Sequence, residues 1–114
     1  MGVLSVPEIY RAALLAGFTP EQASTWTAIA LAESGGNTNA HNPSGEDSRG
    51  LWQINVAADP ERALWGDLYD PLVNAEAAYR ISNRGTDMSP WTTTHEVNRG
   101  TNVDYRSYLD EVEA

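Results

Sequence analysis

Two helix-start signals of the same form stand near the beginning of the chain, and they constrain its fold more than any other feature. Residues 5–8 read Ser-Val-Pro-Glu and residues 19–22 read Thr-Pro-Glu-Gln. In each, a hydroxyl residue can cap the first turn, proline suits that turn, and Glu or Gln follows three residues after the cap. Glycine follows the first segment at Gly17, where a helix commonly ends. The pattern predicts a short helix up to Ala16 and a longer one up to about Glu33.

Further helix signals follow a long polar stretch. Residues 35–50 are rich in Asn, Gly, Ser and acidic residues and offer almost nothing apolar to bury, which predicts a functional loop with room for a short hairpin. An Asp-Pro pair predicts a helix over about 71–82, a Ser-Pro pair at 89–90 starts a short one, and helical spacing predicts a last one over 103–112. We therefore predict a mainly α-helical fold in one domain covering residues 1–114.

Composition narrows the class of protein. The chain has 114 residues, no cysteine, 7 basic and 16 acidic side chains, and a formal charge of −9. A chain of this size supports one modest core, and without cysteine it has no disulfides and no thiolate metal cage. The negative charge argues against nucleic acid as a partner. We expect no cofactor and no metal, because His41 and His95 stand far apart without nearby ligands at metal spacing.

No segment of the sequence is typical of a signal peptide or a membrane span. The first apolar stretch, residues 1–16, is interrupted by Glu8 and Arg11. We therefore expect no membrane partner, and a monomer. Action outside the cytoplasm would need another export route or a longer parent protein.

Glu33 is the candidate for acid–base chemistry that the residues themselves indicate. It follows Trp26, Ile29 and Ala30 at helical spacing, so its carboxyl lies on the apolar face of the second helix. Partial burial and the negative end of the helix dipole should both raise its pKa, and a general acid must stay protonated near neutral pH. The alternative is a solvated helix-end glutamate, or one paired with an arginine such as Arg49.

Four segments together carry a family resemblance. Residues 32–37 read AESGGN, 48–55 SRGLWQIN, 70–79 DPLVNAEAAY and 89–91 SPW. In this order they resemble the lysozyme superfamily, and most closely the lytic transglycosylase-like domains of the soluble type, with a look of phage and actinobacterial members. The resemblance implies a lysozyme-like fold, in which several short helices surround a substrate cleft, and bacterial peptidoglycan as the substrate.

The resemblance also implies roles for single residues. Glu33 would be the general acid/base that protonates the glycosidic oxygen between N-acetylmuramic acid and N-acetylglucosamine. Gln53 matches the motif glutamine and is expected to line the cleft. Asn55 departs from the proline usual in soluble transglycosylases and is similar to the Gln-Ile-Asn of animal-type lysozymes. The other residues expected to bind substrate are Ser44, Ser48, Trp52, Tyr79 and Trp91.

The four tryptophans divide into two pairs. We expect Trp26 and Trp65 in the core. Trp52 and Trp91 lie in segments that match the family, where an aromatic ring can stack on a sugar face, and core packing is the competing interpretation.

The sequence leaves the second catalytic group open. A retaining glycosidase needs a second carboxylate about 5 Å from the acid, and an inverting one needs it at about 6.5–9.5 Å. Ser48 stands where animal lysozymes have aspartate, so Glu46 or Asp47 would have to serve. If neither enters the cleft, the substrate's N-acetyl oxygen stabilises the oxocarbenium, and Glu33 removes the 6-hydroxyl proton to close a 1,6-anhydro ring. We predict this lytic transglycosylase reaction, with a hydrolysing muramidase as the alternative.

A third possibility is a glycan-binding or structural module without turnover, for example in a phage tail or tape-measure protein. Retention of Glu33 argues against it. The expected site of action is the bacterial cell wall, by a phage lysin, a virion-associated protein or part of a larger wall protein. Because the wall is also anionic, the charge of −9 opposes binding. The arginines should therefore gather at the cleft, or a separate module should hold the enzyme to the wall.

Overall fold

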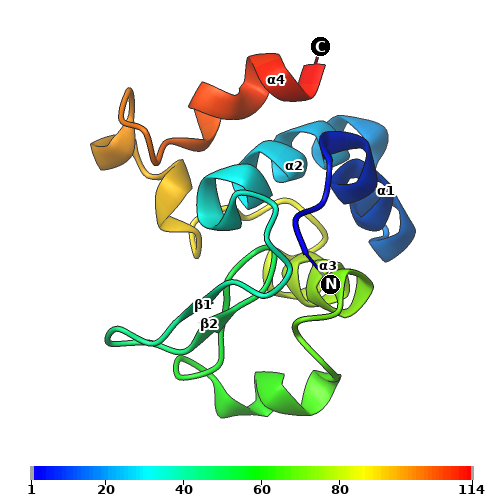
Figure 1. Ribbon diagram of the computed structural model, residues 1–114, viewed down its shortest axis with the longest axis vertical. Coiled ribbons are helices and arrows are strands. Elements are labelled where there is room, and N and C mark those ends of the chain that lie inside the picture. The colour runs from blue at the N-terminus through cyan, green and yellow to red at the C-terminus, as the bar shows by residue number, and fades with distance from the viewer. Residues whose placement is uncertain (1, 114) are drawn as a thin grey trace.

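The first two predicted helices form and end as expected. The computed structural model describes residues 2–113. Helix α1 spans Val6–Ala16 and helix α2 spans Pro20–Ser34, and each begins with a complete capping box, at Ser5 and at Thr19. Helix α2 ends where Gly35 adopts the left-handed conformation. It lies between α1 and the C-terminal segment, and it packs against both (Figure 1).

The predicted third helix is α3, Pro71–Ile81, which Asp70 caps through the backbone N–H groups of Leu72 and Val73. It packs against α1. Its Asn74 is fully buried, and the side-chain oxygen accepts a 2.8 Å hydrogen bond from the backbone N–H of Trp52. The Asn74 amide nitrogen donates 2.8 Å bonds to the carbonyl oxygens of Arg49 and Leu68. One polar side chain of α3 thereby holds the chain segment that follows the polar loop.

The polar stretch forms the predicted hairpin and continues into a third strand. Strands β1 (His41–Asn42), β2 (Ser48–Arg49) and β3 (Ile54–Asn55) make an antiparallel sheet in the order β1-β2-β3. Ser48 pairs with Asn42 on one side and with Asn55 on the other. In Figure 1 the β1–β2 hairpin projects away from the helices.

The second half of the chain differs from the prediction in three places. A 3₁₀ helix, η1 (Pro60–Trp65), was not predicted. The short helix expected from residue 89 is instead a turn followed by two 3₁₀ helices, η2 (Thr92–Thr94) and η3 (Glu96–Asn98). The helix expected over 103–112 starts later, as the 3₁₀ helix η4 (Tyr105–Tyr108), and continues as α4 (Leu109–Glu113).

The late start has a local cause in Asp104. This side chain is almost fully buried, and it accepts hydrogen bonds from the backbone N–H groups of Gly100 and Arg106. A short polar side chain that caps a turn in this way sets the helix start at the residue after it. The prediction that the last helix begins at Val103 was therefore wrong by two residues.

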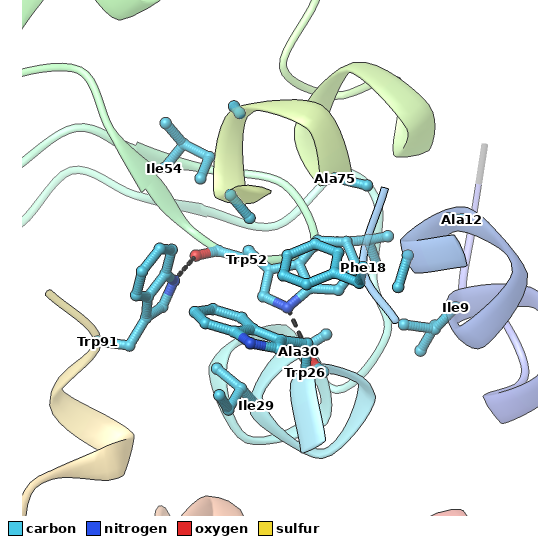
Figure 2. Close-up of a cluster of buried hydrophobic side chains, with 14 of the residues drawn as sticks. Ile9, Ala12, Phe18, Trp26, Ile29, Ala30, Trp52, Ile54, Ala75 and Trp91 are labelled. Atoms are coloured by element: carbon cyan, nitrogen blue, oxygen red, sulfur yellow. Dashed lines mark hydrogen bonds between the residues drawn. The ribbon is translucent and has the colours of Figure 1, made fainter. Parts of the chain in front are cut away.

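Two hydrogen bonds link three tryptophans at the centre of the core. The indole N–H of Trp91 donates a 2.8 Å bond to the carbonyl of Trp52, whose own indole N–H donates a 2.9 Å bond to the carbonyl of Trp26 in α2 (Figure 2). The rings of Trp26 and Trp91 meet edge to face, with centroids 4.7 Å apart. The prediction for Trp26 is confirmed. Trp65 is only partly buried, because it lies at the end of the exposed helix η1 and packs on the core edge.

Among residues 2–113, no helix combines the length and the apolar composition that a membrane crossing requires.

Candidate active site

Glu33 stands in the last turn of α2, which its neighbour Ser34 anchors. The Ser34 hydroxyl donates to the carbonyls of Ala30, at 3.0 Å, and Leu51, at 2.8 Å. It also accepts a hydrogen bond from the backbone N–H of Gly36. The end of the helix is thus joined to the turn before β3, and the Glu33 side chain is carried on a rigid element.

The environment of Glu33 favours its protonated form. Burial raises the pKa of the Glu33 carboxyl above its ordinary value, and the nearby charge of Glu46 contributes in the same direction. The Thr93 hydroxyl donates a 2.9 Å hydrogen bond to Glu33 Oε2 and offsets part of the rise. The predicted direction of the shift is confirmed, with burial as its main cause. The like charge of Glu46 was not anticipated.

The Glu33 side chain opens on a cavity of about 170 Å³ between the hairpin and the segment after α3. The cavity is lined by Glu33, Glu46, Ser48, Gln53, Asn55, Pro90, Trp91 and Thr92. A smaller cavity of about 40 Å³ shares four of these residues and extends the surface to Arg62 and Ile81. We call the two together the Glu33 cleft. It brings together six of the site residues predicted from the sequence.

The hairpin side of the Glu33 cleft is held by side chains that also line it. The Ser48 hydroxyl donates a hydrogen bond to the Glu46 carboxylate. Asn55 Oδ1 accepts from the backbone N–H of Asp47 at 3.1 Å and of Ala57 at 3.0 Å. These contacts hold Glu46 near Glu33, and within residues 2–113 Glu46 forms no ion pair. Glu46 is therefore the second carboxylate of the cleft.

Gln53 has an unusual backbone conformation, with φ of 50°. Its side-chain nitrogen donates to the carbonyls of Ala40, at 3.2 Å, and Gly50, at 3.0 Å. The side-chain oxygen makes no hydrogen bond within residues 2–113 and is available to a ligand. A non-glycine residue at positive φ is strained, and such strain is kept where the surrounding structure imposes it.

Four predicted site residues lie outside the Glu33 cleft. Asp47 is bound by Arg49, at 3.0 and 2.7 Å, and by His41, at 2.9 Å, and these contacts lower its pKa to about 2. It does not line the cleft. Ser44 lies exposed in the loop that joins β1 to β2.

The aromatic predictions need correction. Trp52 has no exposed surface, so the prediction that it stacks on a sugar is wrong and the core interpretation holds. Trp91 lines the cleft but is only 4% exposed, which makes it a part of the floor rather than an open platform. Tyr79 packs edge to face on Phe18 and lines a different cavity. The reason is common to all three: Trp52 and Trp91 belong to the hydrophobic core, and Tyr79 packs against it.

The segments after β3 contribute partners that were not predicted. Thr93 binds the Glu33 carboxylate, and Thr92 and Pro90 line the cleft. Arg62 reaches the extension of the cleft and donates a 3.0 Å hydrogen bond to the Asn55 carbonyl. The three consecutive threonines after Trp91 were the one available signal, because they follow a segment that resembles the family.

Comparison with known protein families agrees with this geometry. A family model described as a lysozyme-like domain matches residues 10–93, and the chain belongs to this family. The comparisons with curated proteins and with solved structures return no match. The predicted family and the mainly helical lysozyme-like fold are thus confirmed. The domain is of the class that acts on the glycosidic bonds of peptidoglycan, and this substrate is part of the bacterial cell wall.

Proposed function

We propose that this chain cleaves the β-1,4 bond between N-acetylmuramic acid and N-acetylglucosamine, with Glu33 as the general acid. The observation that supports it best is a carboxyl whose pKa is raised by burial and which faces a polar cavity at the end of a rigid helix. A raised pKa favours the protonated form of the carboxyl, which can pass its proton to the glycosidic oxygen as the bond breaks.

The role of Glu46 determines which product the reaction gives. Glu46 lines the same cavity as Glu33 and forms no ion pair among the described residues, so it favours hydrolysis, in which this carboxylate activates a water or attacks the sugar. The product would then carry a reducing muramic acid end. Asp47 is the poorer candidate for this role because Arg49 and His41 occupy its carboxylate.

Lytic transglycosylation is the second candidate, and one contact favours it. The Ser48 hydroxyl already binds the Glu46 carboxylate, which leaves that group less free to act on the sugar. In this route Glu33, deprotonated after the first step, would take the proton of the muramic acid 6-hydroxyl. The 6-oxygen then closes on the anomeric carbon, and the product is 1,6-anhydromuramic acid.

Mass spectrometry of fragments released from purified peptidoglycan distinguishes these routes. We expect Glu33→Gln to release no fragments, and Glu111→Gln, a matched change at an exposed glutamate of α4, to behave as the parent chain. Reducing ends that disappear in Glu46→Gln would establish hydrolysis. Anhydro ends that persist in Glu46→Gln would establish transglycosylation. Intact glycan with the unaltered chain would overturn catalysis and favour a binding module.

A further inference from the structure

A larger cavity, of about 420 Å³, lies beside α3 and shares no lining residue with the Glu33 cleft. Its lining consists of Ala16, Glu76, Tyr79, Arg80, Asn83 and Arg84. A neighbouring cavity of about 250 Å³ shares Glu76 and Arg80 with it and extends the surface to Trp65. We call the surface formed by Trp65, Glu76, Tyr79, Arg80, Asn83 and Arg84 the arginine groove.

Within the described residues, the two arginines of the groove form no ion pair with a carboxylate. None of the ion pairs among residues 2–113 includes Arg80 or Arg84, whereas Arg49, Arg99 and Arg106 all have acidic partners. Both groove arginines are exposed. In a chain with a formal charge of −9, two neighbouring cations without acidic partners are an available site for an anion.

The groove is built from fixed parts. The Arg80 guanidinium lies 4.3 Å from the centre of the Trp65 ring, a cation–π contact that orients it. Asn83 and Arg84 both have positive φ, 52° and 62°, and the backbone N–H of Arg84 donates a 2.8 Å bond to the carbonyl of Tyr79. This strained turn after α3 places both side chains in the lining of one cavity.

Neutral polar groups of the groove are also open to a ligand. The Tyr79 hydroxyl and the Asn83 side-chain amide make no hydrogen bond within the described part of the chain, and the edge-to-face contact with Phe18 holds the Tyr79 ring in place. The Glu76 carboxylate, which lines both cavities, can accept a hydrogen bond from a hydroxyl group. The set of groups therefore fits a ligand that carries both anionic groups and hydroxyls.

We propose that the arginine groove binds an anionic polymer of the cell wall, a strand in which phosphodiester or carboxylate groups alternate with hydroxylated units. A guanidinium fork binds either anion through paired hydrogen bonds. Glu76 disfavours a compact multivalent anion but suits a strand whose hydroxyls lie between its charges. The groove would thus retain an acidic domain on an anionic wall. The choice of a wall polymer rests on the proposed function; the anion site itself does not.

Binding of two isolated polymers to the full chain tests this proposal. Polyglycerol phosphate offers phosphodiesters and polyglucuronate offers carboxylates, and neither contains the bond that the Glu33 cleft would cleave. We expect at least one of them to bind, and Arg84→Gln to weaken that binding about tenfold. Arg11→Gln is the matched control, because it removes one charge from an exposed arginine that likewise forms no ion pair within residues 2–113. It should change binding less than twofold. The polymer that binds identifies the anion.

A second variant guards against a folding artefact. Tyr79→Phe removes the free hydroxyl and keeps the ring on Phe18, and it should weaken binding about threefold with unchanged circular dichroism. Absence of binding to both polymers would overturn the proposal. So would equal weakening by Arg11→Gln and Arg84→Gln, since diffuse charge would then explain it. Polymer binding that depends on Arg84, in a chain that releases no fragments from peptidoglycan, would reject the proposed function and leave the groove as an anion site.

Discussion

The end of α2 and the β1–β2 hairpin each carry an acidic side chain near the same cleft, and the two pKa values shift in opposite directions. Glu33 is partly buried where it lines the cleft, and this burial raises its pKa. Asp47 is held by Arg49 and His41 on the half-exposed strand connection, and its pKa falls to about 2. The surroundings of a carboxyl, and not its distance along the chain from a motif, therefore decide whether that carboxyl can donate a proton.

The largest expected effect is on activity, and it distinguishes Glu33 from Asp47. Glu33→Gln should lower the rate of peptidoglycan cleavage by about 10²–10⁴-fold, the usual contribution of a general acid. Asp47→Asn should change it by less than about tenfold, because Asp47 acts on the hairpin rather than in the cleft. Initial rates of turbidity loss with purified walls measure both. A comparable loss in the two variants would remove the distinction.

The next largest effect is on stability, and it concerns the segment after the hairpin that Asn74 holds. Asn74→Ala leaves the backbone groups of Arg49, Trp52 and Leu68 without their partner and should lower the free energy of unfolding by about 3 kcal/mol. Asn102→Ala, at an exposed position, should stay within about 0.5 kcal/mol of the parent chain. Urea unfolding followed by tryptophan fluorescence compares them. Equal stability of the two variants would mean that Asn74 does not hold this segment.

A smaller change sharpens the role of Thr93. Its hydroxyl stabilises the ionised form of Glu33, so Thr93→Val should raise the pKa of Glu33 further. A general acid is active below its pKa, and the alkaline limb of the rate profile should therefore move to higher pH. Thr94→Val, which removes hydrogen bonds only to backbone carbonyls, serves as the control. An unchanged alkaline limb in Thr93→Val would contradict the role assigned to this contact.

The smallest effect is on the pH dependence of stability. The folded-state pKa of Asp47 lies below its ordinary value, so its contribution is complete above about pH 4 and disappears as the pH falls toward 2. Glu33 is the reverse case: its raised pKa makes ionisation destabilising, and the loss grows as the pH rises above about 4.5.

Melting temperatures of two variants measure this difference. Glu33→Gln should melt at a higher temperature than the parent chain at pH 7 and at an equal temperature at pH 4. Asp47→Asn should reduce the loss of stability between pH 4 and pH 2. The test compares the melting temperature of Glu33→Gln with that of the parent chain at each pH. If this difference were no larger at pH 7 than at pH 4, burial would not oppose the ionisation of Glu33.

Local signals were sufficient for the elements that begin with a cap. The boxes at Ser5 and Thr19 and the Asp70 cap determine where three helices start, because their hydrogen bonds join residues only two or three positions apart. After residue 82, the 3₁₀ helices η2 and η3 begin without a side-chain cap. There, the position of the chain depends on contacts with distant partners, such as the bond from Trp91 to Trp52.

The sequence by itself determined the helical class, the placement of Glu33 on an apolar helix face, and the membership in a family whose motifs lie within short segments. Only the tertiary structure decided which neighbours Glu33 would have. Thr93 donates a hydrogen bond to Glu33 and Glu46 lines the same cavity, while Asp47, next to Glu46 in the chain, is bound by Arg49 instead. The physical reason is that a cap is satisfied within one turn of chain, whereas burial and charge at a cleft depend on segments that only folding brings together.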